Sequence, residues 1–271
     1  MTTTPDSGTV HRSLSLKAGA LALAMMLGSG AAWAKDSTNP DDPLEGFNRT
    51  VFTINDNVDR ALFKPITLAY TDLTPKPVRT CIGNIFGNLR DVWSAANSFL
   101  QAQGHDFFNT LGRVLFNTTM GLGGCIDVAS MNGATRIPND LGITLGVWGL
   151  NSGPYLVLPG LGPSSFRDGV GTVGGFAIGM SPTTPLFAID NIPLRNTAVA
   201  LYAVDTRAGL LEADRTVDDI ALDRYSFVRD AYLQRRQSQV NRRRGNDDLP
   251  DYSDDDLPDY SDEDLPDYSE D

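Results

Sequence analysis

The sequence predicts a mainly α-helical protein, and three observations support that fold class. Hydrophobic residues recur at steps of three and four over several long segments, which is the spacing of one face of an α-helix. Alternation of hydrophobic and polar residues, which is typical of strands, is scarce outside residues 155–158. Proline also stands where helices are expected to begin or end, the positions at which it is best tolerated.

The first helix is expected over residues 44–62 and should end at Pro65, because proline lacks the N–H that a helix interior needs. Its hydrophobic positions are Leu44, Phe47, Val51, Ile54, Val58 and Leu62. A second, longer helix should follow Pro77 and run to Phe99. Further helices are expected over residues 107–121, 126–130, 163–180 (weakened by five glycines), 194–213 and 222–241, with a loop over residues 131–140.

Residues 141–173 form a glycine-rich apolar segment with eight glycines and three prolines. No acid, base or histidine occurs in it before Arg167. Loops are normally polar, and apolar core elements are rarely broken by so many glycines. Two interpretations remain open: irregular backbone that meets lipid or lines a cavity for a lipid-like ligand, or a tightly packed buried loop.

The N-terminus predicts export. Residues 1–34 contain a basic stretch, a short apolar run and an Ala-x-Ala site that ends at Ala34, which together are typical of a secretory signal peptide. The apolar run is too short to cross a bilayer, which takes about 20 residues. The mature chain is therefore expected to begin at Lys35, with a helical domain over residues 35–245.

The net charge of −12 lies almost entirely in the C-terminal tail, residues 246–271. An octapeptide, DDLPDYSD with small changes, is repeated three times there, and residues 247–271 hold 13 acids and no base. Such a composition cannot bury a core and predicts disorder. The rest of the mature chain is electrically balanced, so a nucleic-acid partner is not expected. The tail either solubilises the protein or binds a basic partner several times over.

A cluster of arginines ends the last expected helix: Arg235, Arg236, Arg242, Arg243 and Arg244. Three interpretations apply to it. The arginines could attract anionic lipid headgroups, pair with the acidic tail beside them, or form a solvated helix end that is favoured by the helix dipole. We favour the solvated end, because clusters of like charge are usually exposed.

The mature chain has two cysteines, Cys81 and Cys125. In an oxidising compartment they can form a disulfide, but both lie in apolar surroundings where free cysteines also pack well. Two cysteines and one mature histidine, His105, do not predict a metal site. No cofactor is expected either.

Catalytic chemistry is not predicted. A serine hydrolase would have to pair His105 with Ser164 or Ser165, and no G-x-S-x-G turn is present to expose the serine. A surface or helix-capping role for His105 is the simpler interpretation. The protein is therefore not expected to be an enzyme.

Several sequence blocks resemble those of one protein family. They are DPLEGFNRTVFTIND from Asp42, FNTTMGLGGCIDVAS from Phe116, DLGITLGVWGLNSGPYLVLPGLGPSSFRDGVG from Asp140, DTRAGLLEADR from Asp205 and DRYSFVRDAYLQRR from Asp223. In this order, over roughly residues 41–240, the chain resembles the MlaA (VacJ) family of Gram-negative outer-membrane phospholipid transport proteins.

The resemblance implies a ring-like helical domain in the inner leaflet of the outer membrane, on its periplasmic face, with an amphipathic channel. It implies removal of phospholipids misplaced in the outer leaflet, which preserves lipid asymmetry. The implied partners are phospholipid, a trimeric outer-membrane porin, and a soluble periplasmic carrier that delivers lipid to an inner-membrane complex. Many family members carry a lipidated N-terminal cysteine, whereas this chain has an Ala-x-Ala site, and the acidic repeat is not part of the family pattern.

On this resemblance, part of the glycine-rich segment is expected to line or shape the lipid path: Gly146, Trp148, Gly149, Gly153, Pro154, Tyr155 and Leu158. Asn48, Arg49, Arg167 and Asp168 are expected to be structural polar anchors. Two other classes of function stay open, a periplasmic lipid hydrolase and a structural porin-associated protein of the outer membrane.

Overall fold

A computed structural model describes residues 42–245, so the expected signal peptide and acidic tail lie outside the described residues. The fold is mainly helical, as predicted, with one small hairpin. The helices are α2 (Glu45–Val58), the π-helical turn η2 (Asp59–Phe63), α3 (Lys64–Leu73), α4 (Lys76–Leu100), α5 (Gly104–Thr119), α6 (Val128–Met131), α7 (Leu141–Val147), α8 (Phe166–Ala177), α9 (Thr184–Phe187), α10 (Ile192–Ala208), α11 (Leu211–Ile220) and α12 (Arg224–Arg244). Strands β1 (Tyr155–Leu158) and β2 (Gly162–Ser165) pair antiparallel.

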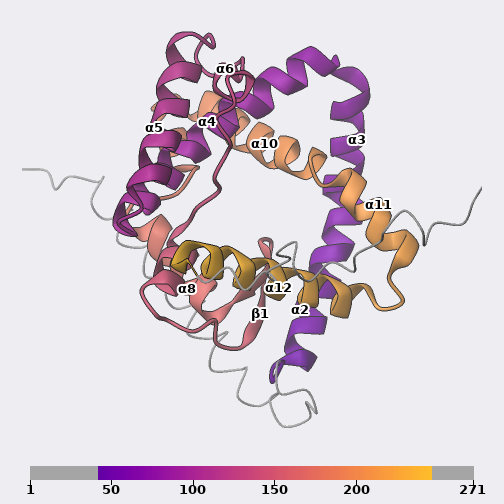
Figure 1. Ribbon diagram of the computed structural model, residues 1–271. Coiled ribbons are helices and arrows are strands. Elements are labelled where there is room, and N and C mark those ends of the chain that lie inside the picture. Colours follow the sequence, from indigo (N-terminus) through magenta and orange to yellow (C-terminus); the bar gives the residue numbers. More distant parts are fainter. Residues whose placement is uncertain (1–41, 246–271) are drawn as a thin grey trace, which may run out of the picture.

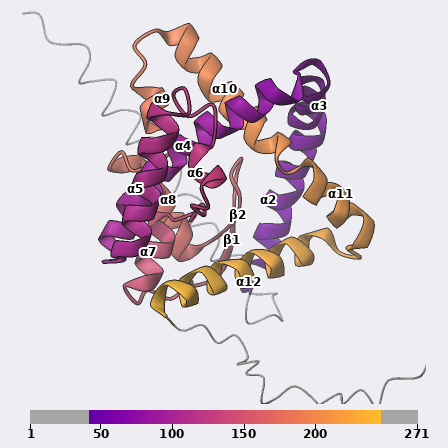
Figure 2. The ribbon, with the colours of Figure 1, turned by 45° about the horizontal axis from the view of Figure 1, so that its top comes forward.

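The helices follow one another around a ring (Figure 1). The chain passes up one side through α2 and α3, across through α4, and down the other side through α5. The small elements α7 and α8 lie at the foot of α5, and the β1–β2 hairpin lies between α8 and α2. The last helix, α12, begins beside α2 and runs to the foot of α5. A view turned by 45° shows the same circuit (Figure 2). The described residues therefore form a ring-like helical domain.

The expected end of the first helix at Pro65 was wrong. The helix continues from α2 through η2 into α3, and Pro65 lies in the first turn of α3. In the π-helical turn each N–H reaches one residue further back, and the N–H of Lys64 accordingly donates to the carbonyl of Asp59. We attribute the continuity of the helix to this change of hydrogen-bond register. It lets Pro65, which has no N–H, follow the π-helical turn without breaking the series of backbone hydrogen bonds.

The other expected helices lie close to their observed positions, the short helix α9 was not expected, and two further differences concern longer segments. The helix expected over residues 194–213 is divided into α10 and α11 at Gly209 and Leu210, because glycine is unfavourable inside a helix. The glycine-rich segment, whose backbone was expected to be irregular, contains the regular helix α7. Its N-terminus is set by Asp140, whose carboxylate accepts a hydrogen bond from the N–H of Ile143 at 2.9 Å.

The ring closes where its first and last helices meet on the hairpin. A cluster of buried side chains joins α2, β1 and α12: Val51, Tyr155, Val157 and Tyr225, flanked by Phe47, Phe52, Tyr232 and Leu233. The free edge of β1 is paired by two amides of α2 rather than by another strand. The Asn48 amide group bonds the carbonyl of Tyr155 at 3.0 Å and the N–H of Val157 at 2.9 Å. Two turns along, Asn55 bonds the carbonyl of Leu158 at 2.9 Å.

The interior of the ring wall is more polar than that of an ordinary soluble protein. Within residues 42–245, 20 polar or charged residues are buried against 10 hydrophobic ones, while 32 large hydrophobic residues are exposed. Water-soluble proteins show the opposite preference, because burial of apolar surface drives their folding. Exposed apolar area on this scale marks a surface that contacts lipid or other proteins.

Candidate functional site

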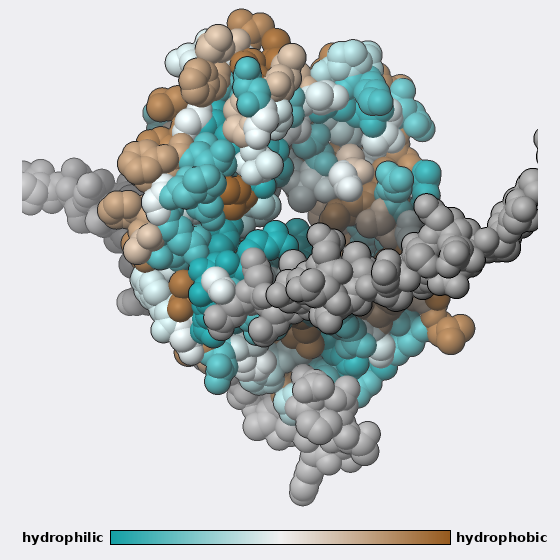
Figure 3. Space-filling model, in the orientation of Figure 1, coloured by the Kyte–Doolittle hydropathy of each residue, from teal (hydrophilic) through white to brown (hydrophobic). Residues whose placement is uncertain are grey.

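The candidate site is the opening of the ring together with the wall around it. The space-filling view shows an opening through the molecule (Figure 3). In the matching orientation of Figure 1, α10 lies above this opening and α12 lies below it. Hydrophilic residues gather at its lower left edge, and brown, hydrophobic residues lie at its right (Figure 3). The opening thus has both a polar and an apolar side.

One part of the wall is held by a chain of buried amides and hydroxyls between α4 and α7. The Thr144 hydroxyl donates to the side-chain oxygen of Asn97 at 2.8 Å, and it accepts from the Gln101 amide at 2.8 Å. Gln101 also bonds Asn139 at 2.9 Å. These buried groups satisfy one another, so the segment that leads into α7 is fixed on α4.

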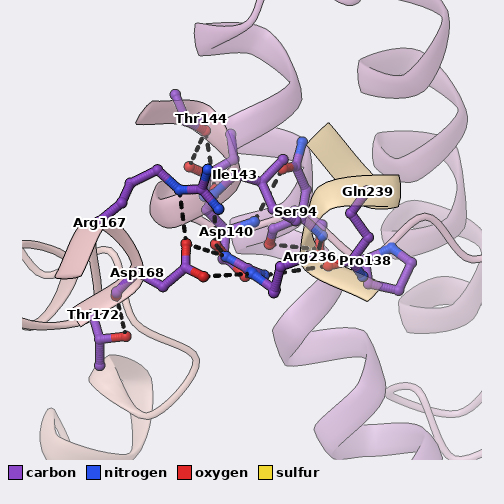
Figure 4. A network of polar contacts seen from close by, with 12 residues as sticks. Ser94, Pro138, Asp140, Ile143, Thr144, Arg167, Asp168, Thr172, Arg236 and Gln239 are labelled. Atoms are coloured by element: carbon purple, nitrogen blue, oxygen red, sulfur yellow. Dashed lines mark hydrogen bonds and ion pairs between the residues drawn. The ribbon is translucent and has the colours of Figure 1, made fainter. Parts of the chain in front are cut away.

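A second network attaches α12 to the glycine-rich segment (Figure 4). The guanidinium of Arg236 forms bidentate contacts with two carboxylates. It meets Asp168 of α8 at 2.9 Å through both Nε and Nη2, and it meets Asp140 at 2.7 and 2.9 Å. The Tyr232 hydroxyl adds a bond to Asp168 at 2.6 Å. Paired guanidinium and carboxylate groups in this geometry are strong and directional, so this network fixes α7, α8 and α12 relative to one another.

The charge state of Asp168 depends on these partners. Burial by itself would raise the pKa of this carboxyl, but the hydrogen bonds and positive charge of Arg236, with help from Tyr232, lower the pKa to about 2. An unfolded chain would have a pKa near 3.9 there. Ionised Asp168 therefore stabilises the folded state above about pH 4, and this contribution is lost as the pH falls toward 2.

We expect acidification from pH 6 to pH 2.5 to destabilise the wild-type protein by about 2 kcal/mol more than an Asp168→Asn variant. The variant has no carboxyl to protonate, so its own pH dependence should come only from the other acids. Chemical unfolding in mild detergent at several pH values measures the difference. Equal pH slopes for the two proteins would show that Asp168 does not keep its low pKa in solution.

The glycines of the lipid path predicted from sequence serve different purposes. Gly146 lies buried in α7, where a Cβ atom would come within 2.7 Å of Val240 of α12 and 3.0 Å of Arg167. It is therefore a packing glycine of the helix contact. Gly149 and Gly153 are exposed and have φ values of +105° and +67°, which disfavour residues with a side chain. These two glycines shape the loop between α7 and β1.

The remaining members of the predicted path divide into buried and exposed residues. Tyr155 is 0% exposed and belongs to the core cluster, so its ring does not reach a lipid-facing surface. Leu158 is half-buried at the end of β1. Trp148 is 59% exposed, and its indole N–H donates to the carbonyl of Leu100 at 3.2 Å. Pro154 is exposed as well, so the accessible part of the segment is the α7–β1 loop.

The predicted polar anchors make structural contacts. Asn48 bonds the edge of β1 as described above, and it also donates to the buried Asp42 at 2.8 Å. Arg49 pairs with Asp223 at 2.7 Å and lies 4.4 Å from the centre of the Tyr225 ring. The buried Arg167 contacts Asp168 at 3.0 Å. The contacts of Arg49 join α2 to α12, whereas the contact of Arg167 with Asp168 lies within α8.

The residues considered for hydrolysis are not brought together as a catalytic pair. His105 has a side chain that is 91% exposed at the start of α5, and its ring contacts Asp106 at 3.2 Å. Ser165 caps α8 by accepting a hydrogen bond from the N–H of Asp168 at 3.2 Å. Ser164 donates to the carbonyl of Ser165 at 3.3 Å. Neither serine lies in the pocket that His105 lines.

The two cysteines form a disulfide bond. Its sulfur atoms are 2.09 Å apart, and it joins Cys81 near the start of α4 to Cys125 in the loop after α5. The neighbouring Asn84 amide donates to the carbonyl of Cys125 at 2.9 Å. In residues 42–245, no group of three or more histidine, cysteine or acidic side chains is placed to hold a metal ion.

Exposed hydrophobic side chains form stripes on three stretches of helix. They are Ile54, Val58, Leu62, Ile66 and Leu73 on α2–α3, Phe108, Leu115, Phe116 and Met120 on and just after α5, and Phe166, Val170, Val173 and Phe176 on α8. Each stripe follows the helical period, so each presents one continuous apolar face. Across the described residues, none of the helices has the length and apolar character needed to traverse a bilayer.

Several residues that hold the wall together were not singled out from the sequence, above all Arg113, Asp91 and Asp127. Arg113 of α5 is completely buried and lies between the two carboxylates, at 3.3 Å from Asp91 and 2.9 Å from Asp127. One signal was available: Asp91 and Arg113 are charged residues within amphipathic helices, and Asp127 stands at a helix start. A single sequence does not show, however, which charge on one helix faces which charge on another.

Comparisons with known proteins agree on one family. Residues 40–239 match the family described as MlaA lipoprotein. The chain is 35% identical over 234 residues to the intermembrane phospholipid transport system lipoprotein MlaA of Escherichia coli K12, covering 84% of this chain and 90% of the relative. The Haemophilus influenzae protein of the same name is 32% identical, over 76% of this chain and 82% of that protein.

A solved structure gives the same result. It is described as the structural basis for maintenance of bacterial outer membrane lipid asymmetry, and it is 35% identical to this chain in sequence. The likeness has a TM-score of 0.62 and covers 74% of this chain and 99% of the other. By sequence and by fold, the chain belongs to the MlaA lipoprotein family.

Proposed function

We propose that this protein maintains outer-membrane lipid asymmetry by removing phospholipids from the outer leaflet and passing them through the ring to a soluble periplasmic carrier. The observation that carries the proposal is the ring itself, which combines an opening, a wall with a polar interior, and exposed apolar stripes on its helices. The relative from E. coli is named for intermembrane phospholipid transport. The family consists of transport lipoproteins rather than enzymes, which agrees with the prediction of a non-catalytic protein.

The exposed stripes support a position in the inner leaflet of the outer membrane, at its periplasmic face. The free energy falls when the apolar side chains on α2–α3, α5 and α8 move from water into lipid or against a protein partner. A ring embedded in one leaflet needs such a surface but needs no spanning helix. An outer-membrane porin is the partner that we propose for part of this surface, and this contact would help to hold the protein at the membrane.

Within the ring, we assign the accessible α7–β1 loop to the lipid path. Trp148, Gly149, Gly153 and Pro154 are its exposed members. The half-buried Leu158, at the other end of β1, is the further member that we propose for the path. Gly146 and Tyr155 support the path from behind by packing against α12 and α2, and they do not contact the lipid directly.

Replacing Gly149 by Leu should raise the amount of phospholipid in the outer leaflet several-fold while leaving secretion intact. A leucine there finds open space but puts a bulky group, and a strained backbone, into the path. Gly160→Leu is the control, because Gly160 also has positive φ and open surroundings but lies at the tip of the hairpin. Labelling of surface-accessible phospholipid in cells that lack the native gene measures the effect. Normal asymmetry with Gly149→Leu would remove the loop from the path.

The proposed function itself is tested by mass spectrometry of the lipid that copurifies with the mature protein in mild detergent. The His105→Ala variant is analysed in parallel. Intact two-chain phospholipid as the main species on both proteins supports a carrier ring. Lyso-lipid and free fatty acid on the wild type, replaced by intact lipid on the variant, would mean that the protein is a hydrolase.

A further inference from the structure

A pocket of about 750 Å³ lies where α5 begins and α12 ends. We call it the α5–α12 pocket. Its third wall is the segment 135–138, part of the connection from α6 that runs toward α12 in Figure 1. The pocket is separate from the α7–β1 loop, and the two hydrogen-bond networks described above assign it no role. Its size is in the range of small-molecule sites.

The charged groups that line this pocket are mostly cationic. Arg242 and Arg243 come from α12, Arg136 comes from the connecting segment, and His105 comes from α5, while Asp106 is the single acid among the lining residues. With histidine counted as neutral, the lining carries three positive charges and one negative charge. An excess of cations in a concave site favours an anionic ligand.

Most of these cations already have protein partners. Arg243 contacts Asp106 at 2.6 Å, the side-chain oxygen of Gln103 at 2.9 Å and the carbonyl of Pro138 at 3.2 Å. Arg136 contacts the buried Asp91 at 3.2 Å. Arg242 is different, because it is exposed and forms no ion pair with the other described residues. Within residues 42–245, it is therefore the lining arginine without an ion-pair partner.

Arg243 is partly buried beside the positive charge of Arg242. Burial lowers the pKa of the Arg243 guanidinium below its ordinary value, and the neighbouring positive charge of Arg242 lowers it further. Asp106 and Asp140 act in the opposite direction without restoring the ordinary value. A further anion beside Arg242 would relieve this repulsion.

The pocket also receives the N-terminus of α5, a helix of 16 residues. Its cap residue Gln103 makes no side-chain cap, because both ends of that amide bond Arg243 instead. The first backbone N–H to bond the cap carbonyl is that of Phe107, so those of Gly104, His105 and Asp106 precede the helical ladder. A Cβ atom on Gly104 would meet nothing within 4 Å, so there is open space beside the first residue of α5. Uncapped N–H groups at a helix start attract phosphate.

From the cavity, Arg242 and the uncapped helix start, we propose that the α5–α12 pocket binds a phosphate group. Arg242 supplies the charge, and His105 and the first N–H groups of α5 supply further hydrogen bonds. Asp106 does not repel the ligand strongly, because Arg243 neutralises it. The phosphate can belong to a glycerophospholipid headgroup or be free inorganic phosphate. The first source rests on the proposed function, since it makes the pocket a headgroup site of the transported lipid.

The test uses the full mature chain in an uncharged detergent. Dioctanoyl phosphatidic acid, inorganic phosphate and dioctanoylglycerol, which lacks the phosphate, are each titrated by calorimetry. Arg242→Gln should weaken the binding of phosphatidic acid at least tenfold and leave that of dioctanoylglycerol unchanged. Arg235→Gln is the matched control, because Arg235 is exposed on the same helix but outside the pocket. Circular dichroism verifies that both variants are folded.

The two phosphate sources are told apart by competition. If inorganic phosphate alone saturates the site and excludes phosphatidic acid, the ligand is free phosphate. If phosphatidic acid binds far more tightly, the ligand is a headgroup. Wild-type affinity in Arg242→Gln overturns the proposal. Phosphate binding that occurs only after deletion of residues 246–271 also overturns the proposal. The acidic repeat, rather than phosphate, would then be the ligand of the pocket in the full chain.

Failure of this inference can be distinguished from failure of the proposed function. Copurified phospholipid at wild-type level, with no phosphate-dependent binding at Arg242, removes the headgroup site and keeps the transport ring. Intact phosphate binding by a protein that carries no phospholipid and does not affect lipid asymmetry keeps the pocket and removes the transport function.

Discussion

Replacing Arg113 by Met should cost about 3–5 kcal/mol of folding free energy, because it would leave the buried Asp91 carboxylate without one of its two guanidinium partners. The Arg113 side chain is 0% exposed and reaches five acceptors on three segments. It contacts Asp91, both oxygens of Asp127 at 2.9 and 3.0 Å, the Ser130 hydroxyl at 2.9 Å and the carbonyl of Ala134. Methionine fills a similar space without any donor.

Asp91 would suffer most from this change. Burial raises the pKa of its carboxyl even with Arg136 and Arg113 beside it. Without Arg113, the pKa would rise further, and part of the cost would appear as uptake of a proton. A second substitution, Asp91→Asn, should therefore recover some of the lost stability in the Arg113→Met background.

Thermal and chemical unfolding in mild detergent, followed by circular dichroism, measures the loss. Arg49→Met is the control, because the ion pairs of Arg49 with Glu45 and Asp223 are about 40% exposed on the arginine side. Exposed pairs of this kind contribute about 0–1 kcal/mol. A loss for Arg113→Met no larger than that of Arg49→Met would mean that the buried network does not hold the wall.

Removing the disulfide by Cys81→Ser and Cys125→Ser should cost about 4 kcal/mol, which is the chain-entropy estimate for closing a loop of this length. The bond closes a loop with a sequence separation of 44 residues, from the start of α4 to the end of the α4–α5 hairpin. Without it, the unfolded chain regains conformational freedom, and the loop after α5 loses its covalent attachment to α4.

Reduction of the wild-type protein provides an independent measurement of the same effect. Unfolding in the presence of dithiothreitol should match that of the double serine variant, while the variant itself should not respond to the reductant. Mass spectrometry of alkylated thiols verifies that the bond has opened. An unchanged unfolding midpoint for fully reduced wild-type protein would contradict the predicted contribution.

The helical fold class and the family could be read from the sequence because both depend on local information. Helical periodicity placed α4, α5 and α12 close to their observed bounds, since spacing and first-turn prolines act within a few residues. The helix end expected at Pro65 was wrong, because no residue type in the sequence predicts the change of hydrogen-bond register in a π-helical turn.

The location of the candidate site was only partly accessible from sequence. The glycine-rich segment was singled out, but its members have unlike roles. Gly146 packs a helix contact, Tyr155 belongs to the core, and Trp148 with Gly149 lies exposed. Composition shows that a segment is apolar and permissive in its backbone. It does not show which of its residues meet another helix.

What the sequence determined by itself was the presence of helices with two unlike faces, the absence of a recognised catalytic pattern, and the family. What only the tertiary structure decided was the direction of those faces and the identity of the buried pairs. Along α2, Val51 is buried but Ile54 and Val58 of the same periodic set are exposed. Arg236 meets Asp140 and Asp168 across separations of 96 and 68 residues. Amphipathic spacing shows that a helix has two different faces. Which face turns inward depends on the surrounding medium and on partners from distant segments. The direction of each face is therefore decided only when the ring closes.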